Sequence, residues 1–495
     1  MRLFLSFLLF ISAAQTASAS YRLTPDVAKA QELVFQLRFK EAAPLLLKAE
    51  KDDPANLLVA SVRCKQYFLT AFLDEQEASA EFFENAAESL HDRIDADMKK
   101  GEDRFAAFVK GELLVFQVLL HTRDRKFIAA AWELNSCHSL ITRNTKRYPD
   151  FLPNELVHGA VTAVLGAIPP EYEWLLRMVG LDGNVESGKG RILKFIKSCP
   201  SSPYFCLMDE AVYTLTSLQY TLTPDQPMDP FLLERLEKQS PGSDLLKYAF
   251  TGLLQKTREN DRALSVLGDE AAHPGTLEIP FIHLRRGQLL SCKLDPAAEP
   301  ELLRFLRDFK GNSFVKAGWQ RVAWLRYLRG DLAGYHAAMV ACKSSGVVLF
   351  DDDKDAQQEA ESGMPPNRYL LKARLYFDGG YYAEAMKSIT GIPSDSFPSV
   401  RDKLELTYRY ARILEGMDRK EQAVNYYEKT IKNGENSRYY FAANSALLLG
   451  QYYEDKKDFA KARLYYERCL LMRDHEYQNG IDQKAKAGMA RVGGR

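Results

Sequence analysis

One motif in the chain comes close to a phosphate-binding loop, namely Gly183-x4-Gly188-Lys189-Gly190. In such a loop, glycine amides and a lysine bind phosphate, and a serine or threonine after the lysine holds magnesium. Here Gly190 takes the place of that hydroxyl, and the preceding residues 174–179 have a helical rather than a strand pattern. The glycines are therefore better interpreted as a helix stop and a tight turn between paired helices than as a nucleotide site.

Other patterns that indicate catalysis or metal binding are missing from the sequence. The eight histidines are scattered, and no two have the spacing of a helical metal pair. Nothing around the carboxylates of 351–353, or around Glu171 and Glu173, would place them in a desolvated cleft, so we expect solvated charges. The Gly-x-Ser-x-Gly motif of a serine nucleophile is absent. These observations predict a protein that is not an enzyme and that uses neither a cofactor nor a metal ion.

Seven cysteines are too few for a disulfide scaffold in a chain of 495 residues. Most lie in apolar, helical contexts, where cysteine packs like a small hydrophobic side chain. Cys199 and Cys206 stand out because they bracket the short Pro-Ser-Ser-Pro loop 200–203. A disulfide would bridge this loop in an oxidising compartment, and two unlinked buried thiols are the other interpretation.

The residues 1–19 have the three parts of a secretory signal peptide. Arg2 gives a positive start, residues 3–14 are an apolar run broken only by two serines, and Ala-Ser-Ala at 17–19 suits cleavage. The run is shorter than the roughly 20 residues of a membrane-spanning helix, and Ser20 rather than a cysteine follows the predicted cut. We expect an exported protein, periplasmic or secreted, without a lipid-modified N-terminus.

The later part of the chain gives no sign of a membrane or nucleic-acid partner. Every later apolar run is interrupted by charges within a few positions, so no membrane span is expected. The charges balance, with 66 basic and 66 acidic side chains. This balance gives no electrostatic footprint for nucleic acid or for an anionic membrane surface.

The C-terminal part contains a repeated pattern of small and aromatic residues. Its clearest copy reads Ala446-x2-Leu449-Gly450-x2-Tyr453, then Phe459, then Ala462-x3-Tyr466-x2-Cys469. This pattern resembles the tetratricopeptide repeat signature, with Ala446 in place of its aromatic start. In such a helix pair, Gly450 lets the second helix approach closely at Ala462, and tyrosines fill the space between the helices.

Three further copies follow the same order. The anchoring alanines Ala385, Ala423 and Ala462 are 38 and 39 residues apart (423 − 385 and 462 − 423), slightly more than the about 34 of the standard repeat. Another copy opens the mature chain, around Ala30 and Ala42. The resemblance implies an all-α fold, an α-solenoid of stacked antiparallel helix pairs in a right-handed superhelix.

Between these ends, the spacing of apolar residues still predicts helices. They are expected over 76–98, 105–121, 125–148 and 319–329, the last followed by a turn at Gly330 and a new helix from 332. The mature chain divides into divergent helical repeats over 20–350, a mobile acidic loop with two prolines over 351–366, and an array of three clear repeats over 367–495. The loop is predicted because its residues cannot bury an apolar face.

One central segment resembles part of a more specific family. It reads Gly159-x8-Ile168-Pro169-Pro170, then Leu175-Leu176-x2-Val179-Gly180-x2-Gly183-x4-Gly188-x4-Leu193. Together with the ending Lys484-Ala485-Lys486-Ala487-Gly488, it resembles the tetratricopeptide repeat 39 family, which includes an inclusion-body clearance protein. Members of that family are intracellular adaptors linked to lipid droplets and protein quality control, so the export signal sets this chain apart. The resemblance implies an all-helical fold without an active site.

In a repeat array, the first helix of each pair presents side chains to a partner. In the three C-terminal repeats, the residues predicted to line this face are Asn367, Arg374, Tyr408, Arg412, Asn444 and Gln451. Arg374, Arg412 and Gln451 occupy equivalent positions, which predicts a ladder for an extended peptide or for acidic groups. A merely solvated polar face is the other interpretation. Paired tyrosines such as Tyr465 and Tyr466 are expected to pack in the core or at its rim rather than to bind sugars.

These observations predict a non-catalytic, exported scaffold or adaptor that holds a protein or peptide partner. The alternative is a capture protein for glycans or small molecules in an outer-membrane uptake system. The missing lipid-attachment cysteine counts against this alternative, and all four tryptophans lie in helical patterns rather than in a large loop insertion. Neither the identity of the partner nor the oligomeric state follows from the sequence.

Overall fold

The computed structural model describes residues 20–101, 103–168, 183–224, 226–268 and 275–493. Within these ranges every regular element is a helix, apart from an isolated bridge between Ser20 and Asn56. Helices that follow one another in the chain pack in pairs, such as α5 with α6, α21 with α22 and α23 with α24. The predicted all-α fold of stacked helix pairs is therefore confirmed. The predicted signal peptide over 1–19 lies outside the described residues.

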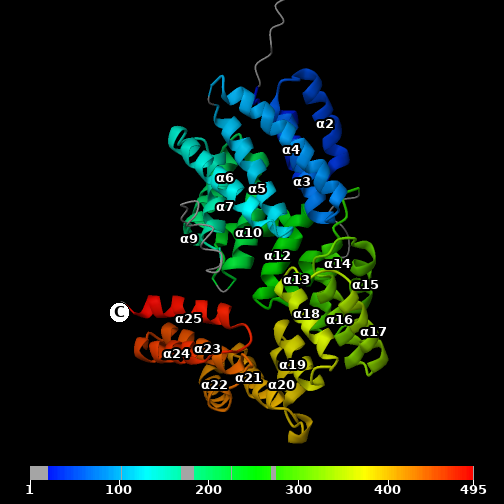
Figure 1. Cartoon of the computed structure of the whole chain (residues 1–495), viewed down its shortest axis with the longest axis vertical. Coiled ribbons are helices and arrows are strands. Elements are labelled where there is room, and N and C mark those ends of the chain that lie inside the picture. Colours follow the sequence, from blue (N-terminus) through cyan, green and yellow to red (C-terminus); the bar gives the residue numbers. More distant parts are fainter. Residues whose placement is uncertain (1–19, 102, 169–182, 225, 269–274, 494–495) are drawn as a thin grey trace, which may run out of the picture. The chain divides into compact units, whose positions relative to one another are not determined.

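The chain forms two compact units (Figure 1). Unit 1 comprises residues 20–246 and 275–278, and unit 2 comprises 247–268 and 279–493. The division of the mature chain at 350 and 367 stays a prediction.

Unit 1 is built from ten α-helices and three short 3-10 turns within its described residues. The helices are α1 (Pro25–Phe35), α2 (Phe39–Asp52), α3 (Leu57–Asp74), α4 (Glu77–Met98), α5 (Arg104–Arg123), α6 (Phe127–Arg147), α7 (Pro153–Leu165), α9 (Val185–Ser198), α10 (Met208–Leu222) and α11 (Pro230–Gln239). The turns are η2 (Cys199–Ser201), η3 (Phe205–Leu207) and η4 (Ser240–Gly242).

Unit 2 begins within α12 (Asp244–Lys256) and carries the C-terminal array. Its further helices are α13 (Asn260–Leu267), α14 (Pro280–Cys292), α15 (Ala298–Asp308), α16 (Val315–Leu328), α17 (Leu332–Ser344), α18 (Asp351–Ser362), α19 (Arg368–Asp378), α20 (Tyr382–Ile389), α21 (Val400–Gly416), α22 (Lys420–Gly434), α23 (Phe441–Asp455), α24 (Phe459–Leu471) and α25 (Gln478–Val492). One 3-10 turn, η5 (Ser394–Ser396), follows α20.

Seven helix pairs in the described chain share one turn. Each turn has a left-handed residue two positions after the first helix and two before the second: Leu37, Arg125, Arg258, Gly330, Gly380, Asp418 and Lys457. In the last pair, the Asp458 amide donates to the Tyr453 carbonyl at 2.9 Å, and the Lys457 amide donates to Glu454 at 2.9 Å. This is the Schellman arrangement that satisfies the last carbonyls of a helix. Because seven helix pairs have this turn, the helix-pair unit recurs more often than the four copies visible in the sequence.

Local signals in the sequence explain where several helices begin. Ser399 starts α21 with a capping box, in which its side chain and that of Asp402 bond to each other's backbone amides. Asn56 caps α3, and Asp103 caps α5. The predicted helices over 76–98, 105–121 and 125–148 correspond to α4, α5 and α6 to within two residues at each end.

The predicted mobile loop over 351–366 is wrong for most of its length, because 351–362 form α18. The three aspartates lie in the first helical turn, where the helix dipole stabilises negatively charged side chains. Asp353 is fully buried and accepts hydrogen bonds from the amides of Phe314 (3.0 Å) and Ala317 (3.2 Å). These amides belong to the start of α16, so α18 is held in place by capping another helix.

The apolar character of α5 also corrects the sequence analysis. This helix is long and apolar enough to cross a membrane, although the sequence predicted no such stretch after residues 1–19. About 61% of its apolar window is buried inside the protein, as in the core helix of a soluble unit. Glu112 on α5 pairs with Lys65 at 2.8 Å, so its charged side chain serves packing within unit 1.

Two glycines of the loop-like motif, Gly183 and Gly188, serve close packing against α7, whereas a methyl group at Gly190 would meet no described atom within 4 Å. Gly188 is neither a helix stop nor a turn residue, because it lies inside α9. A methyl group at Gly159 on α7 would come within 2.7 Å of the Gly188 carbonyl oxygen, so only glycine permits this approach of the two helices. Lys189 is buried and donates to Thr223 (2.7 Å) and Gln226 (2.8 Å) rather than facing an open loop. The segment 169–182, which carries much of the family resemblance, lies outside the described residues.

Candidate functional site

Three of the six predicted partner-binding residues already bond within unit 2. Asn367 caps α19 by accepting from the amides of Tyr369 and Leu370, and its side-chain amide donates to the Ser396 carbonyl. The Asn444 amide donates to the Tyr408 hydroxyl at 2.7 Å, and Tyr408 itself is only 5% exposed. These three side chains fix the array, and a partner would have to displace an internal bond to use them.

Arg412 is likewise engaged. Its guanidinium pairs with Glu415 at 2.8 Å and lies over the Phe377 ring, with 5.2 Å between the guanidinium carbon and the ring centre. Its side chain is 15% exposed. Gln451 is half-buried on α23. The ladder of Arg374, Arg412 and Gln451 stays a prediction.

Arg374 on α19 is the accessible cation of this face. Its side chain is 44% exposed, and its guanidinium lies 5.3 Å from the centre of the Trp324 ring. The distance from its Nε atom to Asp378 is 3.8 Å, which is too long for a hydrogen bond. Desolvation lowers the pKa of the guanidinium, but Asp378 and Glu405 are among the groups that outweigh it and hold the pKa above its usual value. The Arg374 side chain is thus accessible to water although other side chains of unit 2 lie around it.

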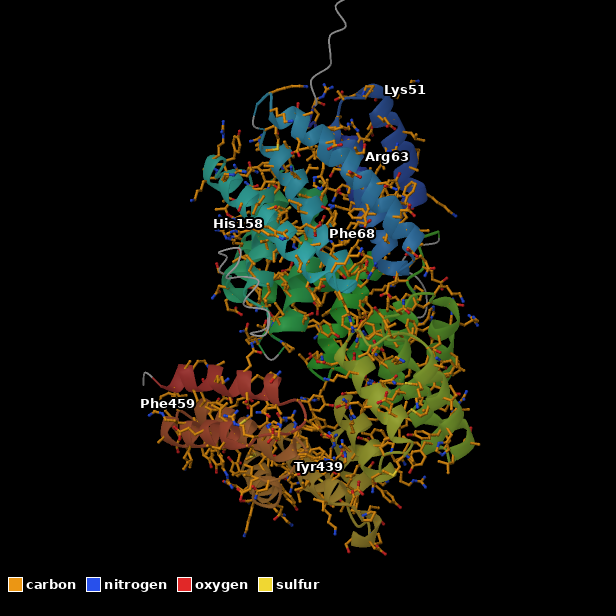
Figure 2. The ribbon with its side chains drawn as sticks, viewed as in Figure 1. Lys51, Arg63, Phe68, His158, Tyr439 and Phe459 are labelled. Atoms are coloured by element: carbon orange, nitrogen blue, oxygen red, sulfur yellow. The ribbon has the colours of Figure 1, made fainter. Side chains whose placement is uncertain are left out.

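The residues around Arg374 come from four helices of unit 2 and from the residues that precede two others. This group, which we name the Arg374 cluster, comprises Trp324 (α16), Asp355 and Glu359 (α18), Arg374 and Asp378 (α19), Glu405 and Arg409 (α21), Tyr440 at the start of α23, and Tyr477 at the start of α25. Figure 2 labels the neighbouring Tyr439, and Phe459 at the start of the outer helix α24.

Most members of the Arg374 cluster were missed in the sequence. Arg409, not Arg412, is the α21 arginine whose charge acts on Arg374. The spacing of Arg401, Glu405 and Arg409, each four residues apart, marks a charged stripe on α21 and is the one local signal that could have revealed it. Trp324 lies 50 positions from Arg374 (374 − 324), so only the packing of the helices brings the two together.

Three of the four carboxylates in the Arg374 cluster bond to other donors, while the fourth, Asp378, lies 3.8 Å from the Arg374 Nε atom. Glu405 pairs with Arg409 at 2.9 Å. Asp355 accepts from the Tyr477 hydroxyl at 2.8 Å. Glu359 accepts from three side chains, those of Trp324 (2.9 Å), Gln320 (2.8 Å) and Tyr335 (3.0 Å).

This arrangement suits recognition of an anionic oxygen pair. Among the described residues, no acceptor lies within hydrogen-bonding distance of the Arg374 guanidinium. Stacking on Trp324 holds the guanidinium plane, and its donors form a fork that matches a carboxylate. No group of three or more His, Cys, Asp or Glu side chains in the described ranges has the geometry to hold a metal ion.

A second charged group lies in the core of unit 1. Lys65 on α3 is 1% exposed and bonds to Glu112 on α5 at 2.8 Å and to Glu210 on α10 at 2.5 Å. Gln31 on α1 also donates to Glu210, at 3.2 Å. Figure 2 labels Phe68, one turn further along α3, which stacks on Phe116 with ring centres 4.2 Å apart. The ion network therefore ties four helices together beside aromatic packing.

One ammonium group serves two carboxylates in this network. Desolvation works against the charge of Lys65, but Glu112 and Glu210 outweigh it and raise the lysine pKa to about 12. Desolvation raises the pKa of Glu112 to about 7, against the attraction of Lys65 and with the repulsion of Glu210. The adjoining cavity has a volume of about 30 Å³, which is room for one or two water molecules and not for a substrate. The network is a structural element.

The seven cysteines are buried, unlinked thiols in the structure. The Cys199 thiol donates to the Tyr204 carbonyl oxygen at 3.3 Å. Burial raises the pKa of both thiols, Cys199 to about 11 and Cys206 to about 12. Both therefore stay protonated and unreactive at neutral pH.

Comparison with known proteins places the C-terminal array in a family. A family model of the tetratricopeptide repeat matches residues 404–433 and 443–475. These ranges cover most of the pair α21–α22 and of the pair α23–α24, whose shared turn recurs in five other helix pairs of the chain. No curated protein matches the chain. The matched repeats, the stacked helix pairs and their common turn agree that the C-terminal part of the chain carries tetratricopeptide repeats.

Proposed function

We propose that this chain is an exported, non-catalytic scaffold that binds a protein partner through the Arg374 cluster. Tetratricopeptide repeats in themselves point to protein–protein interaction. The observation that carries the proposal is the state of Arg374, which stays 44% exposed while the carboxylates Asp355, Glu359 and Glu405 bond to other donors. A carboxylate of the partner would receive two parallel hydrogen bonds from this guanidinium.

Export is the part of the proposal that depends on the sequence alone. The positive start, the apolar run 3–14 and the small residues 17–19 support a cleaved secretory signal, which leads to the periplasm or the exterior. The mature chain would then start at Ser20, whose side chain bonds to Asp53 at 2.6 Å and whose backbone pairs with Asn56. Sequencing the N-terminus of the protein recovered from the cell envelope tests the cleavage site.

The partner test uses the tagged mature chain, crosslinked in its own cell envelope and recovered by affinity, with mass spectrometry of the bound proteins. We expect one or a few proteins at a fixed ratio with the wild type. Arg374→Ala should weaken their binding about 10- to 100-fold, because hydrogen bonds to charged groups are lost. Arg374→Lys should rescue only part of the binding, since lysine is a point charge without the guanidinium fork.

A charge-matched control is Arg419→Ala, at an exposed turn arginine that bonds to Gln422 outside the cluster. Equal recovery by wild type and Arg374→Ala, with unchanged melting of both, would remove the Arg374 cluster from the binding function. If no protein is recovered but a glycan or metabolite screen raises the melting temperature, the capture-protein alternative replaces the scaffold.

A further inference from the structure

The exposed face of α17 is apolar, which sets this helix apart from other second helices of the pairs in unit 2. No Asp, Glu, Lys or Arg occurs in residues 332–342, and Lys343 is the only charged residue of the helix. The helices α15 and α22 each carry five such residues. On α17, Leu332 is 48% and Val340 is 68% exposed. A helix that is apolar on all sides is normally buried, whereas a surface helix turns charged side chains to water.

Within unit 2, α17 is covered on its inner side. Its buried residues are Tyr335, Ala338, Met339 and Cys342, and its main neighbours are α16 and α18. Figure 1 shows α17 at the margin of unit 2. No member of the Arg374 cluster lies on α17, so its exposed face is separate from that site.

Two features of α17 are symmetric about Ala337. Ala333, Ala337 and Ala341 are each four residues apart and form one stripe along the helix. Asp331 and Lys343, both exposed, lie six residues to either side of Ala337 (337 − 331 and 343 − 337). If two such helices meet antiparallel with Ala337 of each at the centre, Asp331 of one copy lies level with Lys343 of the other. The positive end of each helix dipole then also lies beside the negative end of the other.

We propose that the exposed face of α17 binds a second copy of this chain in a symmetric, antiparallel contact between the two α17 helices. The alanine stripe lets the two backbones approach closely, and Leu332 and Val340 of each copy bury apolar area beside it. The pairs of Asp331 with Lys343, one at each end, fix the register. Such a contact is isologous, because the same patch serves both copies.

The size of this contact predicts a weak dimer. The 13 residues of α17 span about 20 Å. One helix of this length buries less than the about 800 Å² per partner of a standard interface. The dimer should therefore dissociate on dilution, with a Kd in the micromolar range.

The first test is sedimentation velocity of the full mature chain over a series of concentrations. We expect the wild type to shift from monomer to dimer as the concentration rises. Val340→Glu should raise the Kd about tenfold or more, because each copy would bury an unpaired carboxylate. The matched control is Val400→Glu on α21, where the valine is 65% exposed, and it should dimerise like the wild type. A wild type that stays monomeric at every concentration overturns the proposal.

The second test locates the centre of the contact. Under a mild oxidant, Ala337→Cys should give a disulfide-linked dimer, because its two thiols meet at the symmetry axis while the seven native thiols are buried. Ala383→Cys, at an exposed position of α20, is the control and should crosslink far more slowly. Equal crosslinking of the two variants, or a dimer that Val340→Glu leaves unchanged, overturns the α17 contact. Neither test involves Arg374, so the dimer and the proposed partner binding fail separately.

Discussion

The ring of Tyr466 lies against Gly450 so closely that a methyl group at position 450 would come within 2.5 Å of the tyrosine Cδ1 atom. Tyr466 is fully buried between α23 and α24, and its hydroxyl donates to Glu454 at 2.6 Å. A methyl group at Gly488 on α25 would come within 2.4 Å of the Cζ atom of the same ring. The tyrosine therefore packs closely against glycines of two helices, which explains the small residues in this repeat.

Gly450→Ala should destabilise unit 2 by about 1–2 kcal/mol, because overpacking outweighs the better helix propensity of alanine. The measurement is the urea midpoint followed by circular dichroism. Gly190→Ala is the control, since a methyl group there meets no atom of the described residues within 4 Å. Gly190→Ala should stabilise α9 by up to about 1 kcal/mol, because alanine has the higher helix propensity. Equal effects of the two substitutions would contradict this close packing.

Lys65→Met should destabilise unit 1 by about 3–5 kcal/mol, because it leaves the Glu112 and Glu210 carboxylates buried without a counter-charge. Lys48→Met removes an exposed partner of Asp26, 2.6 Å away and 63% exposed on the lysine side, and should leave the denaturation midpoint almost unchanged. Chemical denaturation compares the two variants. Similar midpoints for both would show that Lys65 does not compensate the two carboxylates.

The contribution of Glu112 to stability should fall as the pH rises from about 4.5 to 7. Glu112 has a folded-state pKa of about 7 against 4.5 as the reference, because burial disfavours its charged form. Between these values the folded state holds the proton and the unfolded state releases it, so each step up in pH favours unfolding. Glu112→Gln should remove this part of the slope in a series of thermal melts.

The contribution of Asp353 should remain in Glu112→Gln below about pH 6. Burial also raises the pKa of Asp353 in unit 2, from 3.8 to about 6. The contribution of Asp353 to stability also falls as the pH rises, and this fall is complete at a lower pH than that of Glu112. A Glu112→Gln profile that matches the wild type from pH 4.5 to 7 would rule out Glu112 as the titrating group.

Lys457→Gly should stabilise the last repeat by about 0.5–1 kcal/mol, since glycine adopts a left-handed turn without steric cost. Lys457 has φ of 61° in the turn between α23 and α24. The neighbouring Lys456 has φ of −75°, and Lys456→Gly should give no gain. Thermal melts of both variants, at equal ionic strength, decide between a turn effect and a charge effect.

Thiol titration of unfolded, unreduced protein should find seven free thiols. The Cys199 thiol donates to Tyr204, and both Cys199 and Cys206 lie buried without a bond between them. A count of five in protein taken from an oxidising compartment would establish the Cys199–Cys206 bridge instead.

The sequence predicted those features that depend on residues close to one another along the chain. The small residues Ala462 and Gly450 and the spacing of apolar residues predicted helix pairs that the structure contains. Arg374 was placed on the presenting face because helical periodicity decides which side of a helix a residue occupies. Local pattern failed at α18, because this helix is stabilised by a buried aspartate that caps the distant start of α16.

The remaining features required the tertiary structure. Sequence periodicity determined the all-helical repeat fold and the turn at Gly330, since these depend on contacts within about one repeat. The pairing of Tyr477 with Asp355, the neighbours Trp324 and Arg409 of Arg374, and the Lys65 network depend on helices that lie far apart in the chain. Their chemistry follows from burial and distance, which only the packing of these helices sets.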